Sequence, residues 1–153
     1  MLEIERATNR MYRSWRFENE LRHLISACKS DPALAQLVAN PRYEAKIGEV
    51  VVDIEVLKAH VETAVDALAN GDKIGARGSL AKLHWSEAHQ RFAALALELL
   101  SQASLPQLPA VQIARRRFEA IYLQARAETI YAGTTEIQLG IIADRILQLS
   151  KGK

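Results

Sequence analysis

An amphipathic repeat near the middle of the chain constrains the fold most strongly. Between about residues 47 and 68, apolar side chains recur at the i, i+3, i+4 and i+7 spacing of one helix face. These side chains are Ile47, Val50, Val51, Ile54, Leu57, Val61, Ala64, Val65 and Leu68. Asn70-Gly71 follows the repeat and is typical of a helix C-cap. The pattern predicts a long helix with one buried face that ends near residue 70.

The other apolar patterns also predict helices, and no segment alternates in the manner of a half-buried strand. We expect these further helices over about residues 2–29, 33–39, 74–102, 110–127 and 135–149. In the first, the predicted inward residues are Ile4, Ala7, Met11, Trp15, Leu21, Ile25 and Cys28. Asp31 is predicted as an N-cap because Pro32 after it suits the first helical position.

Short connections between these long helices indicate how they pack. They predict an all-α, up-and-down antiparallel bundle of four long helices, a short connecting helix and a C-terminal helix. We expect one domain over residues 1–153, because this length suits a single hydrophobic core.

Composition and charge restrict the partners and the compartment. The formal net charge is +2, and the basic run Arg115-Arg116-Arg117 is more typical of a solvated helix face or of salt bridges than of nucleic-acid binding. Cys28 is the single cysteine, so an internal disulfide is excluded and a buried position is expected. No apolar run approaches the roughly 18 residues of a membrane span, and no signal peptide is recognised. We expect a cytoplasmic protein without a nucleic-acid partner or a membrane span.

The usual motifs of metal, nucleophile and phosphate chemistry are missing. A di-iron helical bundle needs Glu-x-x-His pairs, and the nearest segment, Glu87-Ala88-His89, has a different spacing. No metal site is therefore predicted. The four histidines, expected on the surface or in helix packing, are His23, His60, His84 and His89. No Gly-x-Ser-x-Gly, Gly-x-Gly-x-x-Gly or Walker sequence occurs either.

The segment before the last predicted helix is the most distinctive in the chain. It reads Tyr131-Ala132-Gly133-Thr134-Thr135-Glu136-Ile137-Gln138. Gly133 supplies backbone freedom, and Thr135 lies three residues before Gln138, which is the register of a capping box. We therefore expect Thr134 and Thr135 to satisfy free N–H groups at the helix start.

Continued to Arg145, this segment closely resembles the loop and last helix of the acyl-CoA dehydrogenases, flavoproteins that desaturate acyl-CoA thioesters. Two weaker blocks extend the resemblance to the whole C-terminal helical domain of that family. Leu2-Glu3-Ile4-Glu5-Arg6 resembles the Leu-x-x-Glu-Arg of its first long helix, and residues 79–87 resemble a block of its third. The resemblance implies that the chain is the last domain of a longer enzyme, which would not turn over substrate by itself.

The resemblance also implies where the catalytic groups lie. Most members carry a glutamate, the base that removes the α-proton, at the position of Ala132. In one branch the base lies instead on the first long helix, at the glutamate that matches Glu5. Glu5 is thus the implied base, and the Ala132 backbone N–H is the implied donor to the thioester oxygen. The alternative is that Glu5 is an exposed glutamate in a first helical turn, stabilised by the helix dipole.

The same resemblance implies a cofactor and partners. FAD would contact Thr134 and Glu136, and the acyl-CoA substrate would lie near Tyr131 and Gly133. The bundle would form a homo- or hetero-oligomer. The family's Arg-x-x-Phe-Gly and Gly-Gly motifs have no counterpart here. A second hypothesis is therefore a non-catalytic bundle that stabilises an active dehydrogenase partner.

Overall fold

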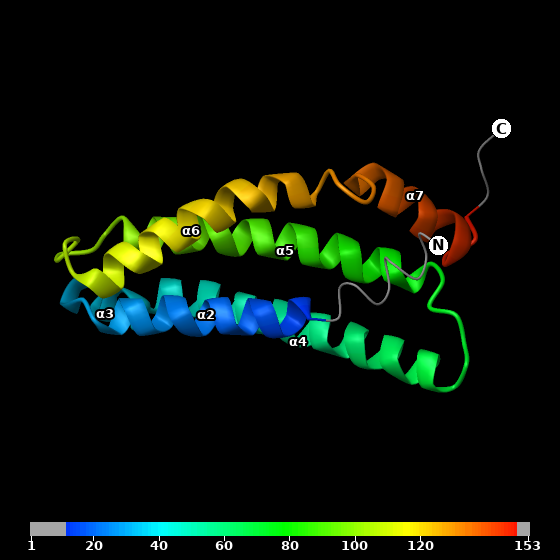
Figure 1. Cartoon of the computed structure of the whole chain (residues 1–153), viewed down its shortest axis with the longest axis horizontal. Coiled ribbons are helices and arrows are strands. Elements are labelled where there is room, and N and C mark those ends of the chain that lie inside the picture. The colour runs from blue at the N-terminus through cyan, green and yellow to red at the C-terminus, as the bar shows by residue number, and fades with distance from the viewer. Residues whose placement is uncertain (1–11, 150–153) are drawn as a thin grey trace.

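A computed structural model describes residues 12–149, and these residues form a helical bundle without a strand. The helices are α2 (Arg13–Lys29), α3 (Pro32–Val38), α4 (Pro41–Ala69), α5 (Arg77–Leu100), α6 (Pro109–Glu128) and α7 (Thr135–Arg145). In Figure 1, α2, α4, α5 and α6 run up and down along the long axis, short α3 lies at one end, and α7 continues beyond α6. The predicted all-α bundle is confirmed.

Helix α5 is central, because it contacts α2, α3, α4, α6 and α7. Its Phe92 is fully buried between Phe17 of α2 and Phe118 of α6. The ring centroids of Phe17 and Phe92 lie 5.1 Å apart, and those of Phe92 and Phe118 lie 5.6 Å apart. Such aromatic pairs contribute about 0.5–1.5 kcal/mol beyond the burial of their area. One aromatic row therefore joins three helices across the core.

Some predicted helix bounds differ from the structure. The helix expected from residue 74 begins at Arg77, because Gly75 has a φ of +54°, which is left-handed and cannot continue a helix. The last helix ends at Arg145 instead of residue 149, and Gln148 is left-handed with a φ of +51°. Residues 2–11 of the predicted first helix lie outside the described residues.

The inward face predicted for the first helix is wrong at Trp15, whose exposed fraction is 65%. Leu21 is buried as predicted, and helix α2 also buries Phe17, Leu24 and Glu20. The apolar pattern misplaces this face because polar side chains occupy part of it. A glutamate can be buried there because its carboxylate pairs with a histidine and an arginine.

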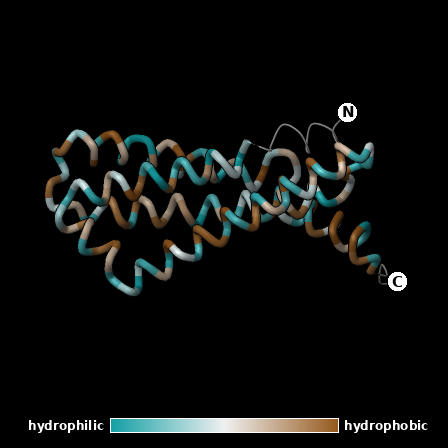
Figure 2. Tube along the Cα trace, turned by 90° about the horizontal axis from the view of Figure 1, so that it is seen from below, coloured by the Kyte–Doolittle hydropathy of each residue, from teal (hydrophilic) through white to brown (hydrophobic). Residues whose placement is uncertain are grey.

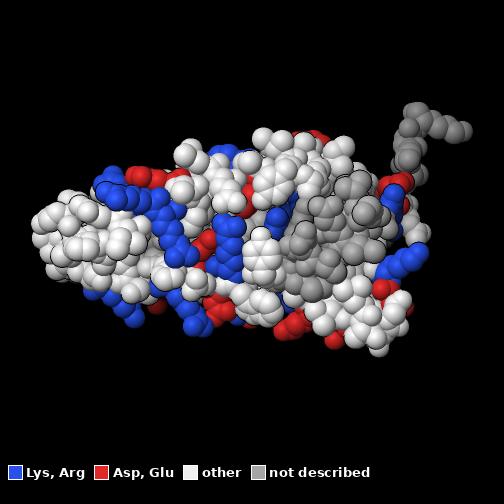
Figure 3. All heavy atoms as spheres, in the orientation of Figure 1, with Lys and Arg blue, Asp and Glu red and all other residues white. Residues whose placement is uncertain are grey.

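The surface carries mixed charge and scattered apolar side chains. On the face in Figure 3, Lys and Arg side chains are interspersed with Asp and Glu. Figure 2 shows hydrophobic residues alternating with hydrophilic ones along the helices. Among residues 12–149, none of the helices combines the length and the apolar character needed to cross a membrane.

The predicted N-cap Asp31 is confirmed, and it also joins two distant loops. Its carboxylate is buried and accepts hydrogen bonds from the backbone N–H groups of Ala33 and Leu34 at the start of α3. It also accepts from the Ser104 N–H and hydroxyl and from the Leu105 N–H, in the connection between α5 and α6. Burial opposes ionisation of Asp31, but these hydrogen bonds outweigh it and lower its pKa to about 2.

We expect Asp31→Ala to destabilise the bundle more than the matched cap substitution Asn40→Ala. Asn40 caps α4 through one hydrogen bond, to the Arg42 N–H, so its loss should cost about 1 kcal/mol. Asp31 additionally holds the α5–α6 connection. Urea unfolding at neutral pH measures both changes, and equal losses would contradict the second role of Asp31. Because its pKa is lowered to about 2 on folding, the Asp31 contribution should be complete above about pH 4 and should be lost as the pH falls toward about 2.

Candidate functional site

The candidate site is the connection between α6 and α7, residues 129–134, here called the α6–α7 loop. Helix α6 ends just before it, and the Tyr131 N–H closes its last turn over 2.9 Å. Ala132 then has a φ of +57° and Gly133 a φ of +101°. These two consecutive positive-φ residues turn the chain before Thr134, the extended N-cap of α7. The loop thus brings four of the residues singled out from the sequence into one tight turn.

Glycine is required at position 133 by both conformation and space. Besides the positive φ, a Cβ atom there would lie 2.5 Å from the Gln138 Nε2 atom. Ala132 has no such freedom, and a left-handed alanine costs roughly 1–2 kcal/mol. A strained residue persists only where neighbouring contacts hold it.

Gln138 provides those contacts. Its side chain is almost fully buried, and its Nε2 donates to the carbonyl oxygens of Ala132 over 2.9 Å and of Gly133 over 3.3 Å. The predicted capping box is therefore wrong: the N-cap Thr134 makes no side-chain cap hydrogen bond, and Thr135 lies within the first turn. The turn directs the carbonyl groups of the loop, and no free helix N–H, toward the Gln138 side chain. The Gln138 amide therefore donates to these carbonyls. Its Oε1 atom is buried without a hydrogen-bond partner among residues 12–149.

Two backbone donors of the loop remain available. The N–H groups of Ala132 and Gly133 donate to no acceptor within the described part of the chain. Both residues are only half-buried. Because both residues are partly exposed, their N–H groups can be reached from outside the chain and can donate to an oxygen atom of a bound molecule.

Glu136 gives the start of α7 a negative charge. Hydrogen bonds from the Thr134 hydroxyl and from its own backbone N–H lower the pKa of this exposed carboxyl, and the charge of Lys82 on α5 adds to the effect. Thr134 is thus turned toward Glu136 and not toward a backbone cap. The side chains at 134 and 136 form one polar pair at the N-terminus of α7.

A buried charged network supports the end of α6 from which the loop departs. His89 of α5 has no exposed surface, and its Nδ1 lies 2.7 Å from Glu128 Oε2, on the last residue of α6. Its Nε2 lies 2.8 Å from Glu20 Oε2 on α2. Both ring nitrogens face carboxyl oxygens, so with the two carboxylates ionised each nitrogen donates a hydrogen bond and His89 is an imidazolium. Arg16 completes the network through a 2.8 Å ion pair with Glu20.

The pKa shifts agree with this charge state. Burial disfavours the imidazolium, but hydrogen bonds to Glu128 and Glu20 outweigh burial and raise the pKa of His89. Burial likewise opposes ionisation of Glu20, yet hydrogen bonds from His89 and Arg16 lower its pKa. The indole of Trp85 stacks on the imidazole, with ring centroids 4.2 Å apart. The network therefore joins α2, α5 and α6 directly beneath the loop.

This network was not predicted, although the sequence carries a signal of it. Glu20 lies three residues after buried Phe17, His89 four after Trp85, and Glu128 three after Ala125. Each polar residue thus falls on the apolar face of its helix. Glu5, the residue expected as the base, lies outside the described residues. Within residues 12–149, no group of His, Cys, Asp and Glu side chains could hold a metal ion.

Comparisons with known proteins agree with the expected family. A family model described as "Acyl-CoA dehydrogenase, C-terminal domain" matches residues 1–147. Acyl-CoA dehydrogenase IpdE1 of Mycolicibacterium smegmatis is 24% identical over 153 aligned residues, which cover 98% of this chain and 35% of that protein. Acyl-CoA dehydrogenase IpdE1 of Mycobacterium tuberculosis is 33% identical over 73 residues, or 48% of this chain and 18% of that protein. The chain thus spans only about a third of the first relative's length.

We expect the stability of the chain to be greatest in mildly acidic solution. The raised pKa of His89 contributes stability that is complete below about pH 6.5 and is lost as the pH rises through the folded-state pKa. The lowered pKa of Glu20 contributes stability that is complete above about pH 4.3 and is lost below it. Urea midpoints across this range measure the dependence.

His89→Leu should lower the free energy of unfolding by about 3–5 kcal/mol, because it removes the cation that Glu20 and Glu128 share and leaves Glu20 only its ion pair with Arg16. It should also abolish the loss of stability above about pH 6.5. The exposed His23 offers a matched control, and His23→Leu should change the free energy by less than about 0.5 kcal/mol. A small loss in His89→Leu would show that the network contributes little.

We expect Gln138→Met to release the α6–α7 loop without unfolding the bundle. The substitution removes two hydrogen bonds but also the unpartnered Oε1, so the two effects partly cancel in global stability. NMR order parameters of Ala132 and Gly133 should fall from about 0.85 toward about 0.6. Gln112→Met, on the exposed face of α6, is the control. Unchanged order parameters at positions 132 and 133 would mean that Gln138 does not hold the loop.

Proposed function

The chain belongs to the acyl-CoA dehydrogenase family through its C-terminal domain, and on this premise we propose that residues 1–153 form one domain of an enzyme that desaturates an acyl-CoA thioester. The observation that carries the proposal is the α6–α7 loop. Its strained turn offers two backbone donors with no acceptor in the described part of the chain, and Gln138 and Gly133 fix their direction.

The reaction needs such a donor. Removing a weakly acidic α-proton develops negative charge on the thioester oxygen, and a fixed N–H group stabilises that charge without reorganisation. The Ala132 N–H would be this donor, and Tyr131 and Gly133 would border the substrate. A backbone donor survives replacement of the side chain, so the alanine at position 132 does not remove this role.

The base requires a different residue, because the Ala132 side chain cannot accept a proton. We propose Glu5 for this role, since it matches the glutamate that carries the base in one branch of the resembled family. General-base catalysis of this kind contributes about 10²–10⁴-fold in rate. Acting from the first helix, Glu5 would leave the loop free to serve as donor only.

The residues at the start of α7 fit a flavin partner. Thr134 and Glu136 form a half-exposed polar pair beside the two free backbone donors, and this pair would hold FAD. When bound, FAD accepts the hydride from the β-carbon. The residues of this loop and helix start would then orient the substrate oxygen and hold the flavin.

Exposed apolar side chains support an assembly role. On α6 and directly after it, the exposed fractions are 68% for Ile113, 71% for Leu123 and 67% for Ile130, and Ile137 of α7 is 54% exposed. Large exposed apolar side chains on neighbouring elements are typical of interfaces. We propose that this outer side of α6 and α7 contacts another domain or subunit of the enzyme. The isolated chain would then be inactive, because it supplies only one wall of the site.

The competing proposal is a non-catalytic bundle that stabilises an active dehydrogenase partner. The alanine at position 132 favours it, since the chain then carries no base in the loop. Both proposals predict assembly, so only a catalytic residue of this chain distinguishes them.

A substitution pair at positions 5 and 132 tests the proposed chemistry in a protein or complex that includes this chain and the flavin-binding part. Glu5→Gln should slow bleaching of the flavin by acyl-CoA by about 10²–10⁴-fold, with flavin content unchanged. Adding Ala132→Glu should restore part of the rate, because it returns a carboxylate to the loop. Full bleaching in Glu5→Gln would remove Glu5 as the base and favour the non-catalytic bundle.

A further inference from the structure

The outer face of α6 carries side chains in a regular register. Along this face and directly after the helix end, exposed positions recur at alternating spacings of three and four residues. This spacing is the a and d pattern of a coiled-coil helix. A helix with this register on its solvent side can pack lengthwise against a second helix. These positions, here called the α6 stripe, are Ile113, Arg116, Ala120, Leu123, Ala127 and Ile130.

The bundle itself does not cover the α6 stripe. Helix α6 packs on α5 and α2 through its opposite side, where Phe118 and Ile121 are buried. The three large apolar members of the stripe are well exposed, at 68% for Ile113, 71% for Leu123 and 67% for Ile130. In Figure 1, α6 lies along one edge of the bundle, and α7 continues beyond its end. Among the described residues, the stripe is therefore open along its length.

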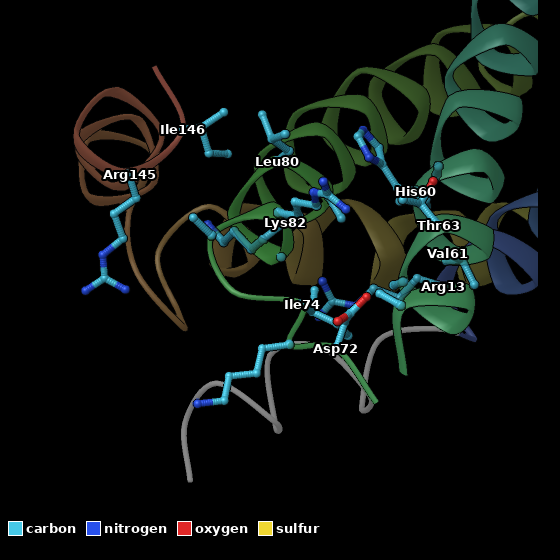
Figure 4. Close-up of a pocket in the computed structure, with 18 residues that line it drawn as sticks. Arg13, His60, Val61, Thr63, Asp72, Ile74, Leu80, Lys82, Arg145 and Ile146 are labelled. Atoms are coloured by element: carbon cyan, nitrogen blue, oxygen red, sulfur yellow. The ribbon is translucent and has the colours of Figure 1, made fainter. Parts of the chain in front are cut away.

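The stripe is also separate from the main hollow of the bundle. A cavity of about 630 Å³ lies between the C-terminal half of α4, the start of α5 and the end of α7. Arg13 and Lys82 line it, and Figure 4 shows His60 on its α4 side and Ile146 on its α7 side. None of the described residues that line this cavity belongs to α6. A partner bound to the stripe would therefore leave the cavity open.

The stripe is complementary to itself when two copies of α6 are placed antiparallel. With the two-fold axis between residues 120 and 123, each a position faces a d position of the second copy. Leu123 then meets the small Ala120, and the small Ala127 leaves room for the Arg116 stem to lie along the contact while its guanidinium reaches water. The three facing pairs are Ile113 with Ile130, Arg116 with Ala127, and Ala120 with Leu123.

Charges beside the stripe favour the same arrangement. Glu119 and Arg126 are exposed on one flank of it, at g positions of the heptad. In an antiparallel pair the g flanks of the two helices lie together, so Glu119 of each copy meets Arg126 of the other. Within the chain, Glu119 has only a long ion pair with Arg115, of 3.6 Å, among its described contacts. A parallel pair would instead place Arg116 against Arg116, and like charges repel.

We propose that the α6 stripe binds a second copy of this chain, and that the two α6 helices pair antiparallel in a two-fold symmetric dimer. A surface that is complementary to itself forms the isologous interface of such dimers. One helix pair buries less than the roughly 1,600 Å² of a standard interface, so we expect micromolar and not nanomolar affinity.

Such a dimer rests on the assembly role proposed above and names its partner. It does not depend on the desaturation chemistry, since it uses neither the α6–α7 loop nor a flavin. Its test needs only the chain itself, and a failure would leave the outcome of the Glu5→Gln bleaching experiment unaffected.

Sedimentation velocity of the chain from about 1 to about 200 µM tests the partner. The mass should rise from monomer to dimer across this range. Leu123→Lys should weaken the dimer at least about tenfold, because it places a charge in the apolar centre. Val52 of α4 is 62% exposed and lies outside the stripe, so Val52→Lys should leave the dimer unchanged. A monomer at every concentration, or equal effects of the two variants, would overturn the proposal.

A charge exchange tests the flanking contacts. Glu119→Arg and Arg126→Glu should each weaken the dimer about tenfold, because each creates like-charge pairs at both ends of the two-fold contact. The double variant should recover most of the affinity, since the exchanged charges still meet. Circular dichroism checks that each variant is folded. A double variant as weak as the single ones would exclude the pairing of these two positions.

Cysteine cross-linking tests the direction of the helices. At 1.5 Å rise per residue, the proposed pairing separates the two copies of residue 120 by about 4.5 Å along the axis, and those of residue 113 by about 26 Å. Ala120→Cys should therefore form an intermolecular disulfide on mild oxidation, and Ile113→Cys should not. The unaltered chain is the control, because Cys28 is buried. Cross-linking of both variants would indicate a parallel pair, and cross-linking of neither would contradict the contact.

Discussion

The structure depends on one buried imidazolium. His89 lies between Glu128 and Glu20, and each of its ring nitrogens binds one carboxylate. None of these three groups could stay charged in the core alone, because each would lose its hydration without compensation. Together with Arg16 they form a neutral set that joins α2, α5 and α6. The contact also fixes geometry, since both hydrogen bonds of a planar ring must be satisfied at once.

That constraint reaches the α6–α7 loop through Glu128, the last residue of α6. The helix end is held by a buried charge, and the chain then turns through Ala132 and Gly133 with two positive φ angles. Gln138 holds the carbonyl side of this turn, which leaves the N–H side available. The loop is therefore supported at both ends by polar groups that are themselves buried. A backbone donor held in this way needs no reorganisation when it meets a developing negative charge.

Features that depend on local chain preferences were predictable from the sequence. Within residues 12–149, the helices of the bundle, the Asp31 cap and the Asn70-Gly71 helix end are confirmed. Errors occur where tertiary contacts compete with a local pattern. Trp15 was assigned to the core because the predicted face was chosen from apolar residues alone, and the buried residue Glu20 is polar. Gln138 was assigned to a capping box, but the turn at Gly133 brings two carbonyls within reach of its amide.

By itself, the sequence determined that the chain forms an antiparallel helical bundle of the acyl-CoA dehydrogenase C-terminal type, with a glycine turn before its last helix. Helical periodicity, caps and turn residues are local, so they can be recognised without coordinates. Only the tertiary structure showed that His89 is paired with two carboxylates and that Arg13 and Lys82 lie in one cavity. The residues of each set are separated by tens of positions in the sequence, so no local pattern links them. The charges of the His89 network become favourable only when folding brings the imidazolium and its carboxylates together, because each group alone would lose its hydration without compensation.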